Sequence, residues 1–196
     1  MGMCLALCSI DVGNLQKVLA DPPLVWRVIA PDDPEIYESA RPKHGLFKKL
    51  FGTTDGRVEE LTLAEGEVQI ADLDKAWHGI HYLLTGTAYE GEGPASYLLA
   101  GGKVVGDIDV GYGPARALTP AEVHDFQQAL AGLSVEDLRT RFNPAEMKAL
   151  EIYPDIWDRD PSEDDTLEYC LEYFKTLRDF VDVVASRNQG LLIYVS

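Results

Sequence analysis

The apolar positions of the chain predict a small sheet surrounded by helices. Residues 3–10 are almost continuously apolar, which is typical of a short strand covered on both faces. Residues 191–195 repeat this pattern near the C-terminus. We expect these two strands to pair in the middle of one sheet, with the helices packed around them.

Helical periodicity dominates the rest of the chain. Apolar residues recur every three or four positions in 12–20, 72–85 and 163–187, and the last segment would span about 36 Å at 1.5 Å per residue. N-capping signals at Thr119, Ser134 and Asn143 predict three more helix starts. Shorter elements are expected as helical pieces at 24–29, 46–51 and 95–100, and as a strand at 115–118.

The length and the absence of a linker indicate one domain. A chain of 196 residues can bury most of the surface that it exposes when unfolded. Residues 30–66 contain several prolines, and residues 88–114 are rich in glycine, so both are the least regular parts. We therefore expect a single compact α+β domain over residues 1–196, mostly helical, with the N- and C-terminal strands at the centre of its sheet.

The charge of the chain narrows the classes of partner. Asp and Glu number 33 against 17 Lys and Arg, which gives a formal net charge of −16. A field of this sign argues against general affinity for DNA, RNA or anionic membranes. The apolar runs are too short to span a bilayer, the first residues lack a basic leader region, and three cysteines do not suggest a disulfide framework. We expect a cytoplasmic protein, whose oligomeric state the sequence leaves open.

The carboxylates are concentrated in one segment. Residues 151–172 hold nine of them against a single arginine, whereas residues 41–57 are basic. One interpretation is a solvated segment whose acids favour a helix N-terminus. The other is an acidic docking face for a basic partner protein. The candidate binding residues are Asp155, Asp158, Asp160, Glu163, Asp164, Asp165 and Glu168.

A second candidate site lies on the helix expected at 72–85. Asp74, His78 and His81 are three or four residues apart and would form one stripe. Two histidines beside a carboxylate can transfer protons or bind a metal, but they can also be hydrogen-bonded structural residues. Further zinc ligands are not evident, so no metal or cofactor is predicted. Tyr153, in a proline-bounded loop, either contacts a ligand or anchors the loop.

Several segments resemble a known family. They are Trp77–Thr87, Leu130–Phe142, Met147 with Glu151–Pro154, the Met1-Gly2-Met3 opening and the apolar final strand. In order and spacing they are similar to the YfbM-like family of bacterial proteins, a domain family of unknown function. The resemblance implies a single-domain α+β protein of the bacterial cytoplasm, in which residues 30–66 and 88–114 are divergent loops or insertions. It supplies no catalytic residue.

Two hypotheses of function follow. The chain contains no P-loop, nucleophile elbow, His-Glu-x-x-His or Cys-x-x-Cys motif. The leading hypothesis is a non-catalytic acidic protein that binds a basic protein partner, as an antidote or an assembly adaptor would. The alternative is a small enzyme or ligand-binding domain that uses His78, His81 and Asp74. The sequence favours the first over an enzyme.

Overall fold

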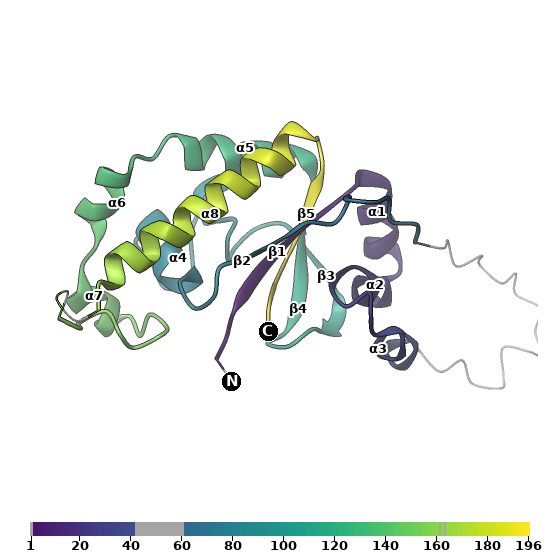
Figure 1. Cartoon of the computed structure of the whole chain (residues 1–196), viewed down its shortest axis with the longest axis horizontal. Helices are drawn as coiled ribbons and strands as arrows, with labels where there is room; N and C mark the ends of the chain where they lie inside the picture. The colour runs from purple at the N-terminus through teal and green to yellow at the C-terminus, as the bar shows by residue number, and fades with distance from the viewer. Residues whose placement is uncertain (1, 42–60, 161, 163) are drawn as a thin grey trace, which may run out of the picture.

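A five-stranded antiparallel sheet organises the protein (Figure 1). The computed structural model describes residues 2–41, 61–160, 162 and 164–196. The strands are β1 (Leu5–Ile10), β2 (Ile70–Asp72), β3 (Lys103–Asp109), β4 (Pro114–Leu118) and β5 (Gly190–Val195), in the spatial order β2-β1-β5-β4-β3. The predicted central pairing is confirmed, because β1 lies against β5 from Leu5 opposite Val195 to Ile10 opposite Gly190.

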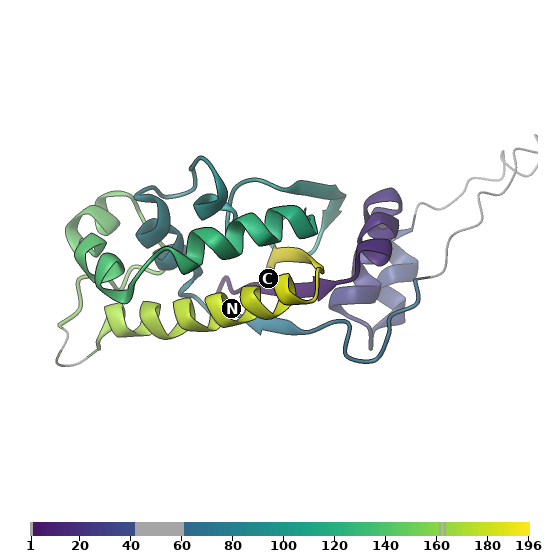
Figure 2. The same cartoon turned by 90° about the horizontal axis from the view of Figure 1, so that it is seen from above.

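The α-helices gather at the two ends of the molecule, as Figures 1 and 2 show. At one end lie α1 (Val12–Ala20), α2 (Val25–Ile29) and α3 (Pro34–Ala40), with the 3₁₀ turn η1 (Pro22–Leu24) between α1 and α2. At the other lie α4 (Trp77–Thr85), α5 (Pro120–Ala131), α6 (Val135–Arg141), α7 (Pro144–Ala149) and α8 (Thr166–Ser186), with the turn η3 (Pro94–Ser96) after α4.

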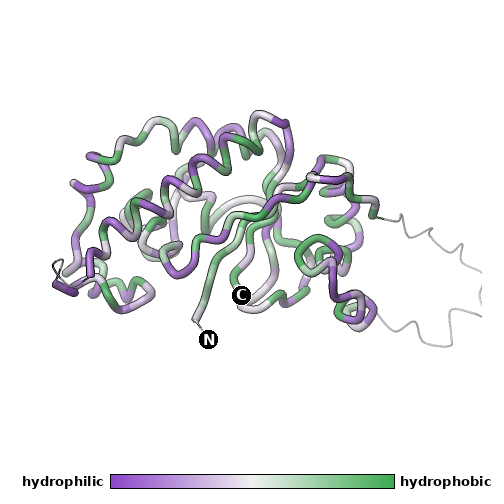
Figure 3. Tube along the Cα trace, viewed as in Figure 1, coloured by the Kyte–Doolittle hydropathy of each residue, from purple (hydrophilic) through white to green (hydrophobic). Residues whose placement is uncertain are grey.

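The central strands are apolar throughout because each face of the sheet is covered. Leu5 and Leu7 of β1 belong to the larger core, which includes side chains from α4, α5 and α8. Cys8 and Ile10 point to the opposite face and join the smaller core, with side chains from α1 and α2. Figure 3 shows hydrophobic residues along β1 and β5. Two cores on opposite faces explain why alternation is invisible in the sequence of these strands.

The predicted helix starts near residues 119–144 are confirmed. Thr119 and Glu122 form a reciprocal capping box, Ser134 and Asp137 form another, and the Asn143 side chain accepts from the backbone of Glu146. The long helix α8 begins at Thr166, because the carboxylate of Asp165 accepts a hydrogen bond from the Glu168 amide and so caps the helix.

Two predictions of secondary structure were wrong. The helix expected at 72–85 begins at Trp77, because Leu73 still donates a hydrogen bond to Leu5 of β1 and Asp74 has a φ of 45°. The glycine-rich segment 88–114 contains the edge strand β3, whereas the helical piece expected at 95–100 is reduced to the turn η3. The amphipathic piece at 46–51 and most of the basic stretch 41–57 lie outside the described residues.

Candidate functional site

His78 connects three segments of the protein from within the core. Its side chain is fully buried, and its Nε2 donates to the carbonyl of Ala88 at 2.7 Å. Its Nδ1 accepts from the amide of Tyr153 at 2.9 Å, so the hydrogen-bond partners define the neutral Nε2–H tautomer. The ring stacks on Trp77 with 4.7 Å between centroids. Burial lowers the pKa of His78, and both ring nitrogens are already used.

His81 lies one turn later and is also fully buried. Its Nε2 donates to the carbonyl of Glu90 at 3.0 Å, and its Nδ1 is buried without a hydrogen-bond partner among the described residues. Burial lowers the pKa of His81 to about 4, and the electrostatic effects of Arg116 and of a protonated His78 act in the same direction. His78 and His81 thus hold the carbonyls on both sides of Tyr89, and we name these two residues the histidine clamp.

Asp74 and Tyr153 lie in separate networks from the histidine rings. The Asp74 carboxylate accepts from the Tyr169 hydroxyl at 2.9 Å and from the Cys4 thiol at 3.5 Å. The Tyr153 hydroxyl accepts from the amide of Met3 at 3.1 Å, and only the backbone of Tyr153 reaches His78. The expected stripe of Asp74, His78 and His81 is therefore not assembled into one constellation. Catalysis by any of them stays a prediction.

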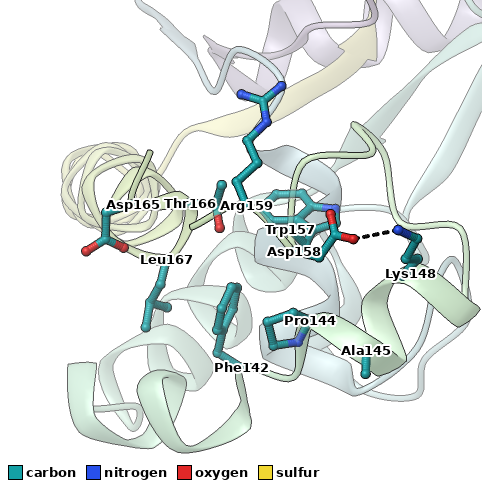
Figure 4. A pocket seen from close by; sticks show the side chains of 10 residues that line it. All are labelled: Phe142, Pro144, Ala145, Lys148, Trp157, Asp158, Arg159, Asp165, Thr166 and Leu167. Atoms are coloured by element: carbon teal, nitrogen blue, oxygen red, sulfur yellow. Dashed lines mark hydrogen bonds and ion pairs between the residues drawn. The ribbon is translucent and has the colours of Figure 1, made fainter. Parts of the chain in front are cut away.

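A cavity of about 650 Å³ opens where α6, α7 and the start of α8 meet the loop between them (Figure 4). Phe142, Pro144 and Leu167 give it an apolar lining, and Asp158 and Lys148 are joined at its edge. The remaining lining residues are Ala145, Trp157, Arg159, Asp165 and Thr166. Acidic side chains that the sequence singled out thus stand beside an apolar hollow that it did not indicate.

Trp157 forms a fixed wall of this cavity. Its side chain is only 2% exposed, and its indole N–H donates to the carbonyl of Ile152 at 2.7 Å. The ring lies so close to α4 that a Cβ on Gly79 would meet it at 2.5 Å. Glycine at position 79 permits this approach, and the cavity is therefore anchored to the main core.

The acidic residues around this cavity differ in their partners. Asp158 pairs with Lys148, Asp164 with Arg159, and Glu168 with Arg139, all at the surface. The hydrogen bond and charge of Lys148 lower the pKa of Asp158. Asp155, Asp160 and Asp165 form no ion pair within the described part of the chain, and Glu163 lies outside it. We call the acidic corner the set Asp155, Asp158, Asp160, Asp164, Asp165 and Glu168.

Asp160 and Asp165 in the acidic corner have local backbone roles. Asp160 accepts from the amide and hydroxyl of Ser162, and Asp165 caps α8. These bonds fix the two carboxylates in place and leave their negative charge without a cation. In the described ranges, no three His, Cys, Asp or Glu side chains are grouped closely enough to hold a metal ion. Of the helices described, none is both long and apolar enough to cross a membrane.

Comparisons with known proteins place the chain in a family. Its fold is similar to that of YfbM from Escherichia coli, whose crystal structure is described as that of a protein of unknown function. The two share a TM-score of 0.65 and 16% sequence identity, over 98% of this chain and 99% of the other. None of the curated proteins matches the chain. A family model matches residues 1–194, and the chain therefore belongs to the family of the domain of unknown function DUF1877.

Proposed function

We propose that this protein is a non-catalytic binding protein, and that the acidic corner docks a basic segment of a partner protein. The observation that carries the proposal is an apolar cavity whose lining includes Asp158 and Asp165. Asp155 and Asp160 lie in the loop that leads to α8 and, like Asp165, form no ion pair among the described residues. Exposed charges of one sign attract an oppositely charged partner and accelerate its association.

The cavity adds a second element of recognition. Phe142, Pro144 and Leu167 can accept an apolar side chain, whereas the carboxylates accept neighbouring Lys or Arg side chains. The segment that fits is therefore amphipathic and basic, with an apolar side chain between cations. A protein that covers a basic effector, as an antidote does, presents a surface of this kind.

Acid–base chemistry at the histidine clamp has less support. His78 uses both ring nitrogens for backbone contacts, and the pKa of His81 lies near 4, so both rings are neutral at neutral pH. A general acid or base requires a titratable nitrogen that faces a substrate. The geometry instead favours the structural interpretation of the two histidines.

The test is salt-dependent binding to a partner captured from the cell of origin. We expect a basic protein that binds the full chain at about 50 mM salt and dissociates at about 300 mM, because screening shortens the range of charges. The variant carries three Asp→Asn substitutions, at positions 155, 160 and 165. Asparagine keeps the capping and turn hydrogen bonds while it removes the charge.

The control carries Asp→Asn at positions 125, 179 and 182, which are exposed acids on α5 and α8 away from the corner. We expect the purified partner to bind the corner variant at least about tenfold more weakly and the control almost normally. If both variants lost the same affinity for the partner, the loss would come from the change in net charge alone, and a specific docking site would be rejected. A partner that binds independently of salt, or no partner, would also reject the proposal.

A further inference from the structure

A second cavity, of about 270 Å³, lies over the central strands and is separate from the acidic corner. Its floor follows the strand register, because Leu5 pairs with Val195 and Arg116 pairs with Ile193, and all four residues line it. Its walls include Trp77, Tyr89 and Tyr112. Among the described residues, the lining contains no Asp or Glu, although the chain as a whole carries a net charge of −16.

Arg116 is the only charged residue in this lining within the part of the chain that the structure describes. Its neighbours on β4, Ala115 and Ala117, belong to the smaller core, so alternation along the strand directs Arg116 to the opposite face. The guanidinium donates four hydrogen bonds of 2.5 to 3.3 Å to the backbone carbonyls of Tyr97, Leu98, Ala100 and Gly101.

The charge of Arg116 has no carboxylate to balance it among the described residues. Burial lowers the pKa of Arg116 to about 10, so the side chain remains a cation at neutral pH. An arginine offers five N–H donors, and the four carbonyl contacts leave Nε–H for a further acceptor. A half-buried cation held only by neutral carbonyls favours an anion beside it.

The backbone that carries the aromatic walls is held in position before any ligand arrives. Tyr89 lies between the two carbonyls that the histidine clamp holds, and its ring is 4.6 Å from that of His78. The backbone of Tyr112 is held by its amide, which donates a hydrogen bond to the carbonyl of Val195 at 3.0 Å. Both tyrosines are nevertheless 60% and 57% exposed, so their rings are open to a ligand. Preorganised aromatic walls reduce the entropy lost on binding.

We propose that this cavity binds a small aromatic carboxylate, with its ring against Tyr89 and Tyr112 and its carboxylate directed to Arg116. The cavity volume of about 270 Å³ lies just below the range of about 300 to 1,000 Å³ for pockets that bind drug-sized ligands, so it suits a smaller molecule of one ring and a short acid arm. A single cation with most of its donors already used suits a monoanion. A phosphate ester would require several more donors.

The test uses 4-hydroxyphenylacetate as the probe and the neutral 4-hydroxyphenylacetamide as its matched control, both with the full chain. The readout is the NMR signal of the Trp77 indole N–H, which donates to the carbonyl of Met3 at the cavity. We expect a saturable shift of this signal, with the amide at least about tenfold weaker because it lacks the charge. Trp26 and Trp157 lie outside the lining and serve as internal references.

Substitutions of the residues that line the cavity test where the probe binds, whatever the charge of the probe. Y89A and Y112A should each weaken binding about tenfold, because stacked aromatic contacts are lost at exposed positions where folding tolerates the change. V104A is the control, since Val104 is 50% exposed on β3 and does not line the cavity. R116Q should abolish binding, and its thermal unfolding shows whether the fold is kept.

Three results would overturn the proposal. The first is equal affinity for the acid and the amide, which would show that Arg116 does not select an anion. The second is unchanged binding by both tyrosine variants. The third is the absence of any shift of the Trp77 signal at millimolar probe. Each leaves the salt-dependent docking at the acidic corner untouched, because the two sites have different lining residues.

Discussion

The histidine clamp and the acidic corner hold their loops by opposite means. The clamp uses two fully buried, neutral rings that bond to backbone groups of residues 88, 90 and 153. The acidic corner uses exposed side chains, and the three ion pairs there have partners with 40% to 57% of their side chains accessible to solvent. The cavity beside the acidic corner reaches the helix that carries the clamp, because Gly79 of α4 lies against the cavity residue Trp157.

The difference shows where polar groups determine structure. A buried hydrogen bond is expensive to break, because the partner left behind has no water to replace it. The charges of an exposed ion pair are already solvated, so loss of the pair changes the free energy of unfolding little. The clamp therefore specifies one path for the loop that carries Tyr89. The acidic corner contributes charge to the surface and little to stability.

The largest expected effect is that of H78A. The substitution removes a buried aromatic ring and leaves the carbonyl of Ala88 and the amide of Tyr153 without their partner. We expect a loss of about 3 to 5 kcal/mol in the free energy of unfolding, measured in urea. The control is H124A, because His124 is exposed on α5 and should change stability by less than about 0.5 kcal/mol. If H78A lowered the free energy of unfolding no more than H124A does, the buried clamp would not differ from the exposed acidic corner in its effect on stability.

The next effect is a pH dependence that belongs to His81. Its pKa is about 4 in the folded protein against 6.5 for an ordinary histidine, so the unfolded chain takes up the proton first as the pH falls. The contribution of His81 to the free energy of unfolding is therefore fully present above pH 6.5 and is lost as the pH falls toward 4. The total loss is about 3 kcal/mol.

The variant for this measurement is H81Q. Glutamine can still donate to the carbonyl of Glu90 but does not titrate. Urea unfolding at about pH 7 and about pH 4.5 should show a smaller loss on acidification for H81Q than for the unaltered chain, by about 2 to 3 kcal/mol. Carboxylates common to both proteins cancel in this difference. Equal losses would mean that His81 accepts a proton as easily in the fold as in water.

The smallest effect concerns the Arg139–Glu168 pair of the acidic corner. A double-mutant cycle with R139A and E168A should give a coupling energy below about 1 kcal/mol, because both side chains are at least 40% exposed. The coupling should decrease further in high salt. A coupling energy above about 2 kcal/mol that does not decrease in high salt would make this exposed pair as strong as the buried contacts of the clamp. The proposed difference between the two regions would then be wrong.

Sequence patterns predicted those elements whose signals are local. The capping boxes at Thr119 and Ser134 were found because the interacting residues are three positions apart. The edge strand β3 was missed because Gly106, in its middle and with a φ of 56°, weakens the strand pattern. The start of α4 was misplaced because residues 70–72 pair with β1, a contact some 60 residues distant along the chain.

For the sites, the sequence by itself determined which residues carry charge and which can titrate, since these are properties of the side chains. It located the acidic segment and the two histidines. Only the tertiary structure decided that Asp74 joins Tyr169 and that the histidines hold the loop around Tyr89. It also decided that Arg116 lies beside a cavity with no carboxylate partner among the residues described. An arginine between two alanines of β4 was the one available signal for the last site. The physical reason is that burial and partners set pKa values and hydrogen bonds, and both arise from segments that meet only when the chain folds.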